Sequence, residues 1–167
     1  MAHSRHTWVR QRFHARCGYC GVSETDVGGE LTVDHYVPVI AGGDDSDDNL
    51  IYACVRCNLY KGDYTVSSNA ALDERVLHPL NDTLSDHYVE NEVGVLESQT
   101  PRGMFHIALL RLNRPQLIQH RRRKRARKQM ETNLTLLLHL IEHQENINAE
   151  QTQALELLRL LLNVTSE

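Results

Sequence analysis

Alternation of apolar and polar residues is clearest in LTVDHYVPV (residues 31–39), which predicts a β-strand that ends at or beside Pro38. The apolar stretch NLIYAC (residues 49–54) predicts a short strand or a turn, and the segment from Cys54 to Asp63 predicts a short helix. Between them, AGGDDSDD has the composition of a loop. Apolar residues at helical spacing predict a further helix over residues 5–16.

The second half of the chain is mixed at first and then helical. Strand-like pieces lie around residues 92–96 and 105–112, and a helix is expected from Pro115, which suits a first helical turn. Asn148 and Gln151 resemble a capping box and predict the start of a second helix. Two leucine-rich stripes mark these helices and indicate a core or a partner interface: Met130, Leu134, Leu137, Leu138 and Ile141, then Leu155, Leu158 and Leu162.

These patterns predict an α+β protein with a module over residues 1–75 and a mainly helical C-terminal region over residues 76–167. The chain has 167 residues, and a hydrophobic content of 41% is compatible with a folded core. No apolar run approaches the ~20 residues that span a bilayer. The basic N-terminus lacks the apolar core of a secretory signal, so we expect a soluble, cytoplasmic protein without a membrane partner.

The net charge of -4 hides an uneven distribution. Residues 114–128 contain eight Lys and Arg and no acid, a charge of +8, which leaves -12 on the rest of the chain. Such asymmetry favours one surface for an anionic partner, although a basic run can also be a solvated helix face. The candidate nucleic-acid contacts in this segment are Arg121, Arg122, Arg123, Lys124 and Arg125.

Four cysteines form two Cys-x-x-Cys pairs, Cys17 with Cys20 and Cys54 with Cys57. Two such pairs are typical of a tetrahedral zinc site, and disulfides are disfavoured in the cytosol. The 33 residues between the pairs exceed the roughly 15–20 of a zinc ribbon, so a folded element must lie between them. Structural zinc is the favoured interpretation, with a redox or disulfide role as the alternative.

The segment between and after the cysteine pairs carries candidate catalytic residues. Asp34 offers a hard oxygen ligand for Mg²⁺ or Mn²⁺, and His35 can activate water because imidazole titrates near neutral pH. Neighbouring side chains of a strand point to opposite faces, so a bulge or bend is expected if both act on one phosphate. The side-chain carbonyl of Asn58 could complete the metal site, or Asn58 could cap a helix instead. Asn49 could brace the loop through its amide. Lys61 could reach a phosphate or be a plain surface lysine.

The chain carries Asp34–His35, then Asn49, then CVRCN followed by Lys61, together with both cysteine pairs. This combination resembles an HNH endonuclease, a ββα-metal finger nuclease. The resemblance covers roughly residues 17–62 and implies that His35 is the general base and that Asp34 and Asn58 bind the catalytic metal. It also implies that Asn49 orients the histidine loop and that the four cysteines hold a structural zinc. The third motif residue is Asn58 rather than His, an HNN variant, which leaves the preferred metal open.

We therefore expect a metal-dependent endonuclease that hydrolyses DNA, most naturally double-stranded, with the basic segment adding phosphate contacts. The alternative is a zinc-ribbon module that binds nucleic acid without catalysis. A homodimer through the C-terminal helices is compatible with either function. The acidic loop lacks the Gly and the final Glu of a calcium-binding EF-hand, and is interpreted as solvated.

Overall fold

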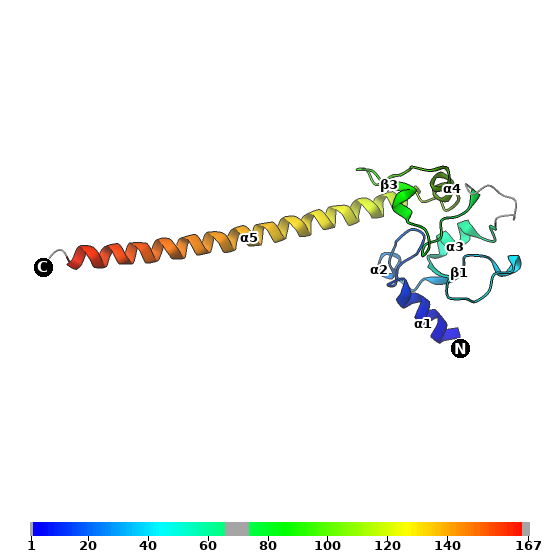
Figure 1. The fold of residues 1–167 in the computed structure, drawn as a ribbon, viewed down its shortest axis with the longest axis horizontal. Coiled ribbons are helices and arrows are strands. Elements are labelled where there is room, and N and C mark those ends of the chain that lie inside the picture. Colours follow the sequence, from blue (N-terminus) through cyan, green and yellow to red (C-terminus); the bar gives the residue numbers. More distant parts are fainter. Residues whose placement is uncertain (1, 66–73, 165–167) are drawn as a thin grey trace. The chain divides into compact units, whose positions relative to one another are not determined.

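The computed structural model describes residues 2–65 and 74–164, and it is an α+β structure as predicted (Figure 1). The chain divides into two compact units, Met1–Arg122 and Arg123–Glu167. The module boundary expected after residue 75 adjoins a segment outside the described residues and stays a prediction. The elements in chain order are α1 (Ala2–Arg12), α2 (Glu24–Val27), β1 (Thr32–His35), η1 (Val39–Ala41), β2 (Leu50–Ala53), α3 (Val55–Lys61), η3 (Leu84–Asp86), β3 (Tyr88–Glu90), β4 (Leu96–Ser98), α4 (Pro101–Leu109) and α5 (Pro115–Val164).

Strands β1 and β2 with helix α3 form the predicted ββα unit. The two strands pair antiparallel from Thr32 opposite Ala53 to His35 opposite Leu50. All four residues of β2 are buried, which is why this strand reads as a continuous apolar run rather than an alternating one. The loop between the strands contains η1, and α3 follows β2 after a single residue, Cys54.

Helix α1 is shorter at its C-terminal end than the helix expected over residues 5–16. It ends at Arg12 because His14 and Ala15 adopt left-handed backbone conformations, with φ of 51° and 54°. This reversal leads the chain into the turn that carries Cys17 and Cys20. The Arg10 guanidinium then pairs with Glu24 of α2 at 2.6 and 2.7 Å, which ties α1 to α2.

Two expectations for residues 84–112 are wrong in detail. The strand expected around residues 92–96 begins only at Leu96, because residues 91–95 form the turn of the β3–β4 hairpin, in which the Asn91 side chain accepts the N–H groups of Val93 and Val95. Residues 105–112 lie largely in helix α4 rather than in a strand. The Thr100 hydroxyl caps this helix by accepting the Gly103 N–H at 3.0 Å, and Pro101 occupies its first turn.

The C-terminal region contains one continuous helix rather than two. Helix α5 begins at Pro115, as predicted, and runs without interruption to Val164 (yellow to red in Figure 1). The expected capping box fails because the Asn148 side chain accepts a hydrogen bond from Gln144 inside the helix, at 3.0 Å. Across the described residues, no helix combines the length and the apolar character needed to cross a membrane.

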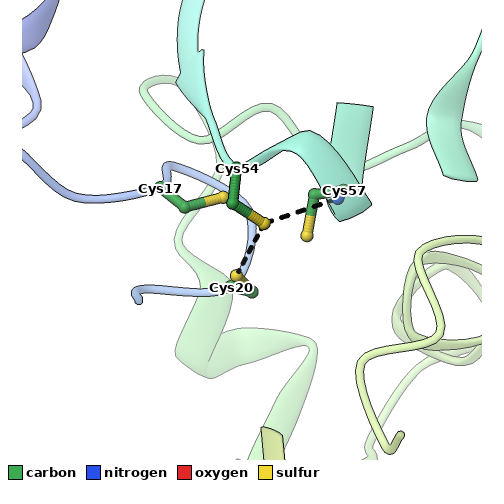
Figure 2. A group of neighbouring side chains, drawn as sticks. All are labelled: Cys17, Cys20, Cys54 and Cys57. Atoms are coloured by element: carbon green, nitrogen blue, oxygen red, sulfur yellow. Dashed lines mark hydrogen bonds between the residues drawn. The ribbon is translucent and has the colours of Figure 1, made fainter. Parts of the chain in front are cut away.

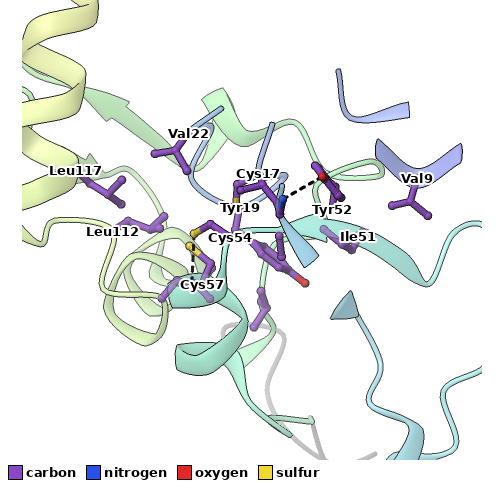
Figure 3. Close-up of a cluster of buried hydrophobic side chains, with 14 of the residues drawn as sticks. Val9, Cys17, Tyr19, Val22, Ile51, Tyr52, Cys54, Cys57, Leu112 and Leu117 are labelled. Carbon is purple, nitrogen blue, oxygen red and sulfur yellow. Dashed lines mark hydrogen bonds between the residues drawn. The ribbon is translucent and has the colours of Figure 1, made fainter. Parts of the chain in front are cut away.

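The core of the first unit surrounds β2 and the cysteines (Figure 3). Val9 of α1 and Ile51 and Tyr52 of β2 have no exposed surface. Leu112 and Leu117 belong to the same buried cluster, so the start of α5 is part of the folded unit that holds the ββα element. The cysteines contribute to this core as well, which couples any metal they bind to the fold.

Candidate metal centre and active site

The four cysteines come from two turns. In the first turn, the Cys17 N–H donates to the Val22 carbonyl and the Gly21 N–H donates to the Cys17 carbonyl, both at 2.8 Å. In the second turn, Cys54 is the N-cap residue of α3 and its Sγ accepts the Cys57 N–H at 3.4 Å. Each sequence pair therefore presents two sulfurs from one tight backbone turn.

All four Sγ atoms lie within 4.8 Å of one another, and the Cys20 and Cys54 sulfurs are 3.7 Å apart (Figure 2). Sulfurs bound to one tetrahedral zinc at ~2.3 Å are separated by about 3.8 Å. The cysteines form no disulfide, and three of the four are buried. Hydrogen bonding among the four sulfurs lowers the pKa values of the Cys17 and Cys54 thiols and raises those of Cys20 and Cys57, so the fit to zinc rests on the positions of the sulfurs. The donor set therefore fits zinc.

Arg114 adds a positive charge beside this cluster. Its guanidinium lies 3.8 Å from the Cys57 sulfur and 4.0 Å from the Cys54 sulfur, and it also packs 5.6 Å from the centre of the Tyr60 ring. Four thiolates on one Zn²⁺ carry a net charge of -2, so a cation here offsets part of that charge. The sequence identified Arg114 only as one member of the basic run.

Asp34 lies in a buried cluster with Tyr19 and Lys61. The Tyr19 hydroxyl donates to one carboxylate oxygen at 2.7 Å and the Lys61 ammonium donates to the other at 3.2 Å. Lys61 also donates to the His35 carbonyl at 2.6 Å. Burial raises the pKa of Asp34, while Lys61 and the Tyr19 hydroxyl act in the opposite direction. The Asp34–Lys61 ion pair is buried, with side-chain exposures of 7% and 1%.

The structure places Lys61 differently from the expected phosphate contact. Its side chain is 1% exposed, because α3 directs it inward against β1. Its ammonium is occupied by Asp34 and by the His35 backbone. The phosphate contact stays a prediction, and in this structure the lysine bridges the two residues of the Asp–His pair.

His35 faces the acidic loop. Its Nε2 lies 2.8 Å from Asp45 Oδ1, and the same carboxylate accepts from Arg5 at 2.9 Å. The hydrogen bond to His35 lowers the pKa of Asp45, which keeps the carboxylate ionised beside the ring. Asp45 belongs to the acidic loop that is expected to be solvated, and no sequence spacing distinguishes it from the other acids of DDSDD.

Asn49 joins the two ends of the loop between β1 and β2. Its side-chain oxygen accepts the Val37 N–H at 2.7 Å, and its Nδ2 donates to the carbonyls of Val37 at 3.1 Å and Asp44 at 2.7 Å. A Cβ atom at Gly43 would lie 1.8 Å from the Val37 carbonyl oxygen, so glycine is required where this loop closes. The loop held in this way is the one that presents Asp45 to His35.

Asp34, His35 and Asn58 line one cavity of about 390 Å³, with Lys61 also in its wall. The Asn58 Nδ2 donates to the Thr32 hydroxyl at 3.4 Å, which leaves its side-chain oxygen as the group able to meet a cation. The expected bulge is not seen among the four paired residues of β1. The two side chains still reach one cavity because His35 is the last residue of the strand and lies at its end.

The basic segment is not uniform. Arg121 is buried and donates to the carbonyls of Gly94 at 2.6 Å and Leu112 at 2.9 Å, and burial lowers its pKa. It therefore fastens the start of α5 to the β3–β4 hairpin within the first unit, instead of standing on the surface as expected. The residues that follow, Arg122, Arg123, Lys124 and Arg125, are exposed.

Comparison with known proteins agrees with this geometry. Residues 17–64 match the family model of the HNH endonucleases. The chain is also similar to the Septu protein PtuA of Bacillus mycoides (strain KBAB4), with 26% identity over 141 residues. That alignment covers 68% of this chain but only 20% of the relative, so the chain spans about a fifth of the relative's length. No solved structure gives a significant match.

The segment that matches the family model contains both cysteine pairs and the whole ββα unit. Residues 17–64 of this chain are an HNH endonuclease domain with a four-cysteine cluster.

Proposed function

We propose that this chain is a metal-dependent endonuclease that hydrolyses phosphodiester bonds of double-stranded DNA. The observation that carries the proposal is the shared cavity, in which a carboxylate, an imidazole and a carboxamide from β1 and α3 meet inside the matched domain. These are the groups needed to hold a hard cation and to take a proton from water.

His35 is the proposed general base. A proton on Nε2 that is donated to Asp45 leaves Nδ1 as the basic nitrogen, and the ionised carboxylate stabilises the imidazolium formed when water loses its proton. Asn49 supports this role indirectly, since its three hydrogen bonds fix the loop that carries Asp45. The imidazole is thereby oriented before substrate binds.

Asp34 and Asn58 are the proposed ligands of a catalytic Mg²⁺ or Mn²⁺. When bound, such an ion supplies positive charge to the phosphate and to the leaving oxygen. Tyr19 and Lys61 each use one carboxylate oxygen of Asp34, and a carboxylate has about four lone-pair sites, so further coordination is open to it. The four cysteines are proposed to hold structural zinc only.

DNA is the proposed partner, and the exposed arginines after Arg121 support it. Cations along one helix bind phosphates without reading sequence, because each contact releases a counterion. Self-association through the C-terminal helix belongs to this proposal as well, since cutting both strands in one encounter calls for two copies of a single-site nuclease. The cytoplasmic location stays a prediction.

The test compares plasmid cleavage in the presence of Mg²⁺ or Mn²⁺ with a gel-shift assay of binding to the same DNA. The nuclease proposal expects nicked or linear plasmid, and His35→Ala should lose roughly 10²-fold or more in rate while still shifting DNA. His143→Ala, an exposed histidine outside the matched domain, is the control and should cut normally. A shifted but uncut plasmid with every metal would instead favour the binding module without catalysis, and cleavage of RNA alone would overturn the choice of DNA.

Asp45 gives a second and more specific test. Asp45→Asn should keep the fold, lower the cleavage rate and shift the pH profile of cleavage, because an amide no longer stabilises the imidazolium. Asp47→Asn is the matched control in the same acidic loop. Identical pH profiles for the two variants would remove Asp45 from the mechanism without affecting the assignment of His35.

A further inference from the structure

The second unit, the part of α5 from Arg123 onward, leaves many large apolar side chains exposed. Leu134, Leu137 and Leu158 are 57%, 53% and 55% exposed, and Leu155 is 60% exposed. Most helical stability in proteins comes from packing an apolar face, and exposed apolar surface of this extent marks an interaction site. A helix with this composition calls for a partner along its length.

Because α5 is continuous, its two leucine stripes share one frame. Leu134, Leu137 and Ile141 are followed by Leu155, Leu158 and Leu162 at the same three- and four-residue steps. Ile141 and Leu155 are separated by 14 residues, which is two heptads. A strict seven-residue repeat drifts by about 20° per heptad on a straight α-helix, so a repeat kept over four heptads favours supercoiling around another helix.

Polar residues occupy the middle of this seam. In the same heptad frame, Gln144, Asn148 and Gln151 fill the three positions between Ile141 and Leu155. Gln144 and Asn148 lie on one face, since the Gln144 amide donates to the Asn148 side chain at 3.0 Å. Buried polar residues at seam positions weaken a coiled coil but specify its register.

The polar centre also distinguishes the two orientations of a partner helix. In a parallel pair in register, each seam residue meets its own copy, so polar residues meet polar residues and leucines meet leucines. In an antiparallel pair the two kinds of seam position face each other, and every alignment places at least one of the glutamines against an aliphatic side chain. A buried amide without a partner costs free energy, so the parallel alignment is preferred.

We propose that residues 130–162 of α5 pack in parallel and in register against the same residues of a second copy of this chain. This seam is about 50 Å long at 1.5 Å per residue, and Leu138 and Leu140 flank it and widen its apolar surface. In this arrangement the exposed basic segments of both copies, residues 122–128, meet at the same end of the coiled coil. The pair would therefore offer phosphates a doubled cationic surface.

The first test measures mass in solution by light scattering on the full chain. The wild type should have the mass of two or more chains, and Leu158→Glu, in the seam, should weaken association by roughly 10²-fold. Leu160→Glu is the matched control, because Leu160 is 63% exposed but lies opposite the seam, and it should associate as the wild type does. Circular dichroism confirms that both variants stay helical. A monomeric wild type, or equal effects of the two variants, would overturn the proposal.

The second test addresses orientation. Leu137→Cys and Leu155→Cys, which occupy the two different kinds of seam position, are prepared separately with zinc bound to the native cysteines, and mild oxidation is followed by non-reducing gels and mass spectrometry. Each variant alone should form a disulfide between chains when the helices are parallel and in register. Cross-linking that occurs only when the two variants are mixed would show an antiparallel pair and would refute the assignment.

Discussion

Lys61→Met should destabilise the first unit through Asp34, because it leaves a buried carboxylate without its cation. Both residues are almost fully buried and the ion pair spans 3.2 Å. At an effective dielectric constant of about 20, two unit charges at that distance attract by about 5 kcal/mol. Removing one partner of a buried pair typically costs ~3–5 kcal/mol, so we expect a loss of this size in the free energy of unfolding.

The assay is urea unfolding of zinc-saturated protein, followed by tryptophan fluorescence, in a double-mutant cycle. Asp34→Asn alone should also be costly, since it strands the ammonium, while Asp34→Asn with Lys61→Met should lose far less than the sum. Lys124→Met removes an exposed lysine and is the control for charge alone. If Lys61→Met behaved like Lys124→Met in unfolding but weakened DNA binding, Lys61 would be a phosphate contact after all, and the buried-pair argument would be refuted.

Three further predictions concern zinc, pH and salt. Cys54→Ser should lose about one zinc per chain, measured by atomic absorption, and unfold the first unit, because the cysteines are part of its core. His106 of α4 has no exposed surface, and burial lowers its pKa from 6.5 to about 4. Its contribution to the free energy of unfolding is therefore complete above pH 6.5 and should be lost as the pH falls toward 4, by about 3 kcal/mol. His106→Gln should flatten that part of the stability curve, and a curve parallel to wild type would contradict the assignment. Charge reversal in the exposed basic segment should weaken binding to unrelated DNA sequences and flatten its salt dependence, by about 0.9 log units per lost contact; unchanged slopes would indicate a solubility role for Arg122, Arg123 and Arg125.

The ββα unit was predictable because its signals are local. Each cysteine pair is a four-residue turn, β1 alternates, and the loop composition separates the strands. The β3–β4 hairpin and α4 were harder to predict, because the side-chain hydrogen bonds of a single residue determine where each of them begins or turns. Asn91 turns the chain with its side chain, and Thr100 starts a helix within a stretch whose composition also suits a strand. Neither hydrogen bond leaves a periodic pattern in the sequence.

The site shows the same division between local and distant information. The motif residues could be named in advance, but their partners could not. Tyr19 and Lys61 approach Asp34 from 15 and 27 residues away, and Asp45 is one of four aspartates in a loop. Arg121 is chemically identical to its exposed neighbours, and only the carbonyls of the hairpin distinguish it. Contacts between distant segments depend on how the elements pack, which composition and spacing do not specify.

Helix α5 is the opposite case, because the spacing of its apolar residues predicts a contact with a second chain, which a single chain cannot contain. The heptad frame is a property of residue spacing and needs no tertiary information, but the two leucine stripes share one frame only because the helix is continuous through Asn148. Asn148 and Gln151 were interpreted as a helix start because such residues favour caps. At seam positions of a coiled coil the same side chains instead specify the register of the two helices. A partner that matches them residue for residue is another copy of the same sequence. The polar interruption that suggested two helices is thus the feature that argues for two chains.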